Sequence, residues 1–384
     1  MQLRPTTLGL LAAAFVSTAF VTAPSAKADD IRLASGETIS GVNVTEETLT
    51  KIFYRKGGSA KDVDVDQVIS ITYDEFPRLV KNAEDAAAEG DIASAIAAYD
   101  VYVDGQLDNP TEKTKLWAPA YSAFRSVELN RSLGAYDAVI SAADRLLSNY
   151  GKTRYVPATY LAKAEALRYT GKADAAVTTL QSLAKLVADE KLSERYALDA
   201  ELALLEIDKS LTPAKRLERL GTLVSRAGSK FPTVLRRAQL LQGQTQLELA
   251  TAASEAKDAA KVDAALEAAR SAFDTILAAP ESDDYVRAGA HVGIGDCIFF
   301  KASPGDDAEG LAAAGREYLK VTVLYPGERV HLVHALFFAG RCYHQLGALN
   351  DSQVDRDRAL RIFSRLRREF PAHPLSGRAR EYMG

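Results

Sequence analysis

The sequence predicts a mainly α fold, an α-solenoid of about seven helical hairpins that follows a small β-barrel-like domain at the N-terminus. Three observations lead to this prediction. Apolar residues alternate with polar ones over residues 30–74, they recur every three or four residues after Phe76, and later segments repeat one spacing of apolar residues. We therefore divide the chain into a signal peptide (1–28), a small β domain (29–75) and a helical repeat domain (76–384).

The first thirty residues have the three parts of a secretory signal. Arg4 gives the basic start, an apolar run extends from Leu8 to Val21, and Ala26-Lys27-Ala28 supplies the small residues around a cleavage site. The apolar run is too short to span a bilayer comfortably. We expect cleavage after Ala28 and a soluble protein in the periplasm or another compartment outside the cytoplasm. No later stretch approaches the roughly eighteen apolar residues that a membrane span needs.

Composition excludes several classes of protein. Loss of Arg4 and Lys27 with the signal changes the formal charge from -4 to -6, which does not suggest nucleic acid as the main partner. The chain has 2 cysteines, which excludes a scaffold dense in disulfides. The charged and apolar contents are those of an ordinary globular chain.

The alternating segment predicts four or five short strands, with turns at Ser35-Gly36 and Lys56-Gly57-Gly58. The alternating apolar residues are Ile31, Leu33, Val42, Val44, Val63, Val65, Ile69, Ile71 and Tyr73. A small barrel or a curled sheet would accommodate them. The pattern from Asp30 to Gly41, closing with Val68-Ile69-Ser70-Ile71, resembles small Sm-like or SH3-like barrels. Such barrels bind RNA in one family and peptides in another, and both alternatives remain open.

Helical hairpins are predicted from Pro77 to Phe370, followed by a closing helix from about Pro374 to Tyr382. Three segments with the same apolar spacing begin just after a glycine that ends the preceding helix, namely Gly90, Gly134 and Gly171. Further repeats are indicated by Tyr325-Pro326 and Phe370-Pro371, by Gly295-Asp296-Cys297 and Gly340-Arg341-Cys342, and by a boundary at Phe231-Pro232. One hairpin cannot cover its own apolar face, so neighbouring hairpins must stack.

These repeats resemble the tetratricopeptide family. Glu89-Gly90-Asp91-Ile92 runs into Ala95, Ile96 and Tyr99 like the turn and second helix of that repeat, and Gly340, Tyr343, Leu346-Gly347, Ala359, Phe363 and Phe370-Pro371 follow its pattern across a whole unit. Several units are longer than the roughly thirty-four residues typical of the family, and the hairpin from Ser193 to Gly228 lacks the signature. The last two units are similar to periplasmic repeat proteins that coordinate the Tol-Pal machinery and to outer-membrane assembly lipoproteins.

The resemblance implies that the first helix of each hairpin lines a concave surface that holds an extended peptide or a partner helix. In the last unit this points to Phe337, Phe338, Arg341 and His344 as partner-binding residues. The last hairpin also carries a basic group, Arg356, Arg358, Arg361, Arg365, Arg367 and Arg368. Most of this group is read as solvated surface, while Arg361, Arg365 and Arg368 are candidates for binding an anionic envelope component.

No motif predicts a catalytic, cofactor-binding or metal-binding residue. Gly289, Gly293 and Gly295 fall inside a helical pattern, where small residues permit close packing. His331, His334 and His344 are read as ordinary surface or partner-facing histidines rather than metal ligands.

Two further patterns leave alternatives open. Cys297 and Cys342 occupy equivalent places in successive units, so they are either a disulfide or two buried thiols. Asp62, Asp64 and Asp66 share one face of a strand, which is read as a solvated face, with calcium as the alternative.

We interpret the chain as an exported, non-enzymatic scaffold that binds protein or peptide partners through a helical-repeat surface in the bacterial envelope. The alternative is an envelope protein that binds peptidoglycan or polysaccharide. A hydrolase is the third class, but it would need a convergent acid-base group, and the sequence displays none.

Overall fold

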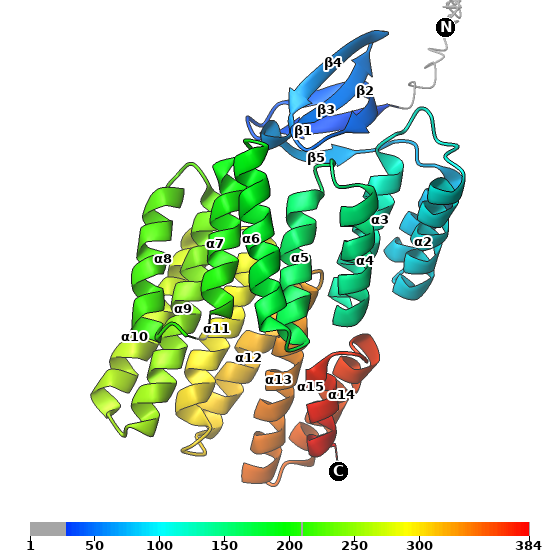
Figure 1. Cartoon of the computed structure of the whole chain (residues 1–384). Coiled ribbons are helices and arrows are strands. Elements are labelled where there is room, and N and C mark those ends of the chain that lie inside the picture. Colours follow the sequence, from blue (N-terminus) through cyan, green and yellow to red (C-terminus); the bar gives the residue numbers. More distant parts are fainter. Residues whose placement is uncertain (1–27, 209, 384) are drawn as a thin grey trace, which may run out of the picture.

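The computed structural model describes residues 28–208 and 210–383 of the 384-residue chain, and its helices pair into a curved stack beside a small sheet (Figure 1). The predicted signal peptide falls almost entirely on residues 1–27, which lie outside the described residues. In the described part, no helix is both long and apolar enough to cross a membrane.

The sheet has five antiparallel strands in the spatial order β4-β3-β2-β1-β5. They are β1 (Asp29–Leu33), β2 (Thr38–Glu47), β3 (Lys51–Lys56), β4 (Ser59–Asp64) and β5 (Val68–Thr72), with a 3-10 turn over Val65–Gln67. The predicted alternation is confirmed, because Ile31, Val44 and Ile52 are buried while Asn43 and Phe53 beside them are exposed.

Of the two alternatives, a barrel and a curled sheet, the closed barrel does not form. β4 and β5 are the two edges of the sheet and do not pair with each other. The apolar face of the sheet is instead covered by helices, since Ile31 shares a buried cluster with Val80, Ala83 and Tyr99 of the first hairpin. A sheet whose apolar face is covered in this way has no need to curl around its own core.

The fourteen helices α1–α14 form seven antiparallel hairpins within the described residues, as predicted. The first helices are α1 (Arg78–Ala88), α3 (Ala118–Ser132), α5 (Val156–Tyr169), α7 (Glu194–Ile207), α9 (Pro232–Glu255), α11 (Asp284–Ala302) and α13 (Arg329–Leu349). The second helices are α2 (Ile92–Asp108), α4 (Tyr136–Asn149), α6 (Ala173–Asp189), α8 (Pro213–Ala227), α10 (Ala259–Ala278), α12 (Ala308–Leu324) and α14 (Gln353–Glu369). The chain then forms α15 (Pro374–Arg378) and a 3-10 turn (Ala379–Tyr382), which together span the predicted closing helix.

The turns inside the first three hairpins depend on glycine. Gly90, Gly134 and Gly171 have φ angles of 84°, 69° and 78°, in the left-handed region that other residues rarely adopt. Each glycine ends a first helix and lets the second helix start within two residues. The repeat spacing read from the sequence therefore has a backbone cause.

The stack curves because the first helices approach one another more closely than the second helices do. Contacts join α3 to α5, α5 to α7, α7 to α9, α9 to α11 and α11 to α13. The first helices therefore lie on the inner side of the curve, and we call the side of the stack formed by α3 through α13 the inner face.

The curve brings the last repeats back to the second hairpin, so that the orange and red helices lie below the turn between α3 and α4 (Figure 1). Arg329 at the start of α13 donates from Nε to the carbonyl oxygen of Ser132 at 3.4 Å. His373 packs against Gly134, where an added Cβ would lie 3.0 Å from the imidazole Cδ2. Burial lowers the pKa of His373 to about 4, so this ring is neutral at pH 7.

Glycines inside α11 permit close helix packing, which confirms the packing interpretation of Gly289, Gly293 and Gly295. A Cβ at Gly293 would lie 2.2 Å from Cζ of Phe273, and a Cβ at Gly295 would lie 2.7 Å from Cε1 of Tyr318. At Gly289 the nearest atom is Cδ2 of Leu240, at 2.7 Å. These three positions let α11 contact α9, α10 and α12 without gaps.

We predict that Gly293→Ala destabilises the repeats by about 1–3 kcal/mol, because the added methyl group overlaps the buried ring of Phe273. Gly221→Ala in α8 is the matched control, since nothing lies within 4 Å of the place that its new methyl group would occupy. That change should stabilise the protein by about 0.5–1 kcal/mol through helix propensity. Denaturant unfolding followed by circular dichroism measures both, and equal stabilities for the two variants would contradict the packing account.

Candidate binding groove between the sheet and the repeats

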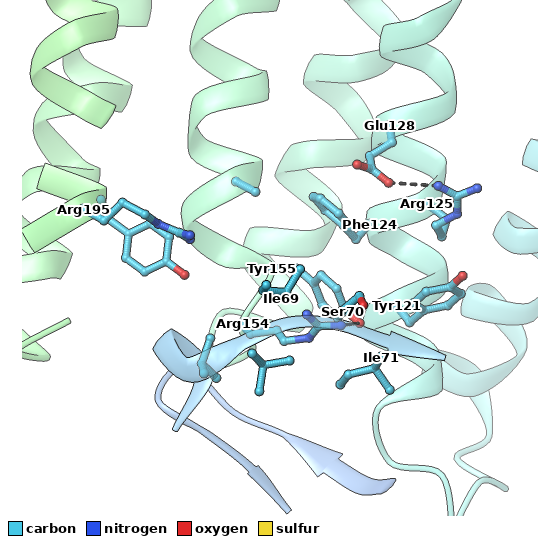
Figure 2. A pocket seen from close by; sticks show the side chains of 14 residues that line it. Ile69, Ser70, Ile71, Tyr121, Phe124, Arg125, Glu128, Arg154, Tyr155 and Arg195 are labelled. Carbon is cyan, nitrogen blue, oxygen red and sulfur yellow. Dashed lines mark hydrogen bonds and ion pairs between the residues drawn. The ribbon is translucent and has the colours of Figure 1, made fainter. Parts of the chain in front are cut away.

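A groove separates strand β5 from the first helices of three successive hairpins. Its volume is about 400 Å³, in the range of small ligand and peptide sites. One wall is β5, and the other is built from α3, from the turn before α5, and from the start of α7 (Figure 2). The residues of the second wall are Tyr121, Phe124, Arg125, Glu128, Arg154, Tyr155, Ala158, Arg195 and Tyr196. We call this site the groove.

An aromatic cluster fixes the sheet at the mouth of the groove. Tyr73, just after β5, stacks on Trp117 with a ring-centroid distance of 3.7 Å. Trp117 is buried and donates from Nε1 to the carbonyl oxygen of Val44 at 3.0 Å. Phe76 and Tyr121 each contact both of these rings edge-on. The sheet and the repeats therefore share one core at this joint.

A buried ion pair lies beneath the aromatic cluster. The Arg154 Nε donates to Glu47 Oε2 at 2.8 Å, and the Glu47 side chain is 0% exposed. The hydroxyl of Tyr73 donates to the other oxygen of the same carboxylate. Burial raises the pKa of Tyr73 well above its usual value, which keeps that hydroxyl protonated and able to donate. Glu47 comes from β2 and Arg154 precedes α5, so the pair joins the sheet to the repeats.

The charges of the groove are partly neutralised within it. Arg125 lies between Glu128, at 3.0 Å, and Glu84, at 3.5 Å. Arg195 is exposed, lies over the ring of Tyr196 at 4.6 Å, and makes no ion pair in the part of the chain that the structure describes. The wall formed by the repeats thus presents one cation without a partner beside aromatic rings.

Further along the inner face, arginines and glutamates from neighbouring first helices form a ladder. Arg131 of α3 pairs with Glu165 of α5, and Arg168 of α5 pairs with Glu206 of α7 at 2.9 Å. The Glu206 side chain is 46% exposed and so partly buried. This partial burial raises the pKa of Glu206, and Arg168 works against the rise.

The four residues predicted in α13 do not share one surface. Phe337 is 0% exposed and packs against Phe338, Phe363 and Tyr382, so its assignment to a binding surface is wrong. It points into the joint between α13 and the closing turn rather than to solvent. Phe338 and Arg341 are partly buried, and the Arg341 guanidinium lies 5.3 Å from the ring of Phe338.

His344 is exposed at the far end of α13, with its ring edge toward Tyr382. His344 does not line the groove. Partner binding at Phe338, Arg341 and His344 stays a prediction.

The predicted basic residues of α14 share one helix face, because Arg361, Arg365 and Arg368 are spaced at about one turn. Arg365 pairs with Glu369 at 2.8 Å, and the Arg368 side chain is 73% exposed. Arg361 is also exposed. Their role in binding an anionic component stays a prediction.

The three histidines do not converge. His331 is buried against the ring of Tyr285, and burial lowers its pKa to about 3. His334 stacks on Phe338 instead. Over residues 28–208 and 210–383, no group of three or more His, Cys, Asp or Glu side chains is placed to hold a metal ion.

Cys297 and Cys342 are both free and buried, so the disulfide alternative does not hold in this structure. Burial raises the pKa of each thiol to about 12, which leaves both unreactive.

In the sheet, Lys51 bridges Asp62 at 2.7 Å and Asp64 at 2.9 Å. A lysine therefore occupies the place considered for calcium.

The groove residues were not predicted from the sequence, although one signal was present. An Arg-Tyr pair recurs at 154–155 and 195–196, at the starts of α5 and α7, and in both pairs the guanidinium lies over the adjacent ring. Recurrence at equivalent places of successive first helices suggests a shared surface. The contribution of β5 carries no comparable signal.

We predict that Arg154→Met lowers stability by about 3 kcal/mol, because it leaves the buried Glu47 carboxylate without its partner. Trp117 is the single tryptophan of the chain, so its fluorescence reports directly on the joint during denaturant unfolding. Lys163→Met is the control, because Lys163 pairs with Asp144, whose side chain is 54% exposed. This substitution should lower the free energy of unfolding by less than about 1 kcal/mol. Similar losses in both variants would show that the Glu47 pair does not hold the joint.

No family model matches the sequence, and no curated protein matches it. Similar solved structures include a tetratricopeptide repeat protein from Parabacteroides merdae, with 13% identity, 79% of this chain and 96% of that chain covered, and a TM-score of 0.33. The C-terminal part of a repeat protein from Cytophaga hutchinsonii has 15% identity, covers 79% and 99%, and has a TM-score of 0.27. The P58(IPK) repeat domain has 14% identity, covers 80% and 87%, and has a TM-score of 0.26. The fold class therefore rests on the seven hairpins of this chain.

Proposed function

We propose that this chain is an exported, non-enzymatic scaffold of the bacterial envelope that binds protein partners in the groove and along the inner face. The observation that carries the proposal is the groove itself. It combines aromatic side chains, an arginine without an ion pair among the described residues, and a strand edge, all held in place by the contacts of Trp117.

Several features favour a protein partner. Aromatic and arginine side chains dominate binding energy at protein interfaces, and Tyr121, Phe124 and Arg195 supply both kinds. Hairpin repeats bind through extended inner surfaces, because each added unit lengthens the surface. Phe338 and Arg341 would extend the surface toward the C-terminal repeats.

Export is supported by the sequence rather than by the fold. Arg4, the apolar run from Leu8 to Val21, and Ala26-Lys27-Ala28 follow the order of a cleavable signal. Cleavage after Ala28 would leave Asp29, whose carboxylate accepts from the amides of Val44 and Asp74 and so ties the new N-terminus into the sheet.

The non-enzymatic role is supported by the state of the carboxylates on the inner face. Glu165 and Glu206 are each bound by an arginine from a neighbouring helix. Arg168 opposes the rise in the pKa of Glu206 that burial causes, and we interpret each carboxylate as one half of an ion pair between helices. These pairs serve to align successive first helices.

Photo-crosslinking in the native envelope tests the proposal. A photoreactive residue at Ala158, which is exposed and lines the groove, should crosslink to a small, reproducible set of proteins. The same residue at Val354, 64% exposed on α14, is the matched control and should give none of them. Arg195→Glu in the Ala158 background should reduce the crosslinks.

Three outcomes would contradict the proposal. One is identical crosslinks from Ala158 and Val354. Another is recovery of the protein in the cytoplasmic fraction with residues 1–28 retained. The third is pelleting with isolated wall material without protein crosslinks, which would favour the peptidoglycan- or polysaccharide-binding alternative.

A further inference from the structure

The two edges of the sheet differ in chemistry. β4 carries Lys61, Asp62 and Asp64, charges of the kind that prevent another strand from pairing with an edge. β5 reads Val68-Ile69-Ser70-Ile71-Thr72 and has no charge and no proline. One edge is therefore protected against strand addition, and the other is not.

The unprotected edge faces the groove. β5 pairs with β1 along one side only, and its residues 68–71 line the groove on the other. Ile69 is 62% exposed, a large value for an apolar residue next to a folded core. In Figure 2 the strand runs across the mouth of the groove, with Tyr121 and Tyr155 toward the helices and Arg154 over the strand itself.

β5 is also held rigidly, which lowers the entropy cost of adding a strand. Tyr73 follows the strand directly and is fixed by Trp117 and Glu47. On the other side, Ile31 of β1 lies opposite Ile71 in the sheet and is buried. An incoming chain would meet a preformed template.

The opposite wall indicates the charge of the incoming chain. Arg195 points toward the groove and lacks an ion pair in the described part of the chain, and Arg125 lies deeper in the same wall. Because side chains of a strand alternate between two faces, one face of an added strand would contact Tyr121 and Phe124, which are partly buried and line the groove. An acidic side chain near its end would reach Arg195.

We propose that the groove binds an extended, acidic segment of a partner protein, which adds to the sheet as a sixth strand beside β5. This inference rests on the proposed function and specifies how the partner binds. Main-chain hydrogen bonds to β5 supply affinity. Arg195 selects segments with an acidic residue, and the aromatic side chains of the groove select segments with β-branched or aromatic residues.

A displayed library of random twelve-residue peptides, selected on the full-length mature protein, tests the inference. Enriched peptides should alternate apolar and polar residues and carry Asp or Glu. Binding of the synthetic peptides should slow hydrogen exchange at the backbone amides of β5. N-methylation of alternate peptide amides should weaken binding by about tenfold or more, since it removes strand hydrogen bonds.

Variants of the protein locate the bound peptide. Arg195→Glu should weaken binding of the acidic peptides by about tenfold. Arg219→Glu, at an exposed site on α8, should leave their affinity unchanged. Peptides that bind along the inner face without protecting β5 would overturn the strand addition while leaving the proposed function intact. Failure to enrich any peptide that depends on the groove would also overturn it. So would a dimer held by two β5 edges, detected by light scattering.

Discussion

The burial of Glu47 beside Arg154, under the stacked rings of Tyr73 and Trp117, is the interaction on which the rest of the molecule depends. It joins strand β2 to the third hairpin, which lies far away in the chain. A carboxylate without solvent exposure is costly unless its partners stay in place. The sheet is therefore held in one orientation, and the groove beside β5 exists because of it.

The repeats supply the second constraint. Glycine turns set the hairpins, and small residues in α11 let neighbouring helices approach closely. The closer spacing of the first helices bends the stack until Arg329 meets the carbonyl of Ser132. On the inner face, the Arg131–Glu165 and Arg168–Glu206 pairs join neighbouring first helices and neutralise their charges.

Local patterns in the sequence predicted local structure well. Alternation predicted the strands, and the glycines with apolar spacing predicted seven hairpins, because both signals arise from neighbouring residues. Openness of the sheet was not predictable, since it depends on the first hairpin covering the apolar face. Phe337 was misassigned for a similar reason: helical spacing does not distinguish the joint with Tyr382 from the inner face. The groove combines β5 with three separate hairpins, and only the recurring Arg-Tyr pairs hinted at it.

The central claim is that the sheet and the repeats form one rigid unit around the groove. Pulsed electron spin resonance measures this directly, with labels on cysteines introduced at Lys61 of β4 and Ala158 of α5, both exposed. The native thiols are buried and should remain unlabelled. The account predicts a single narrow distance distribution. A broad distribution, or two populations, would show that the sheet moves independently and that no fixed groove exists.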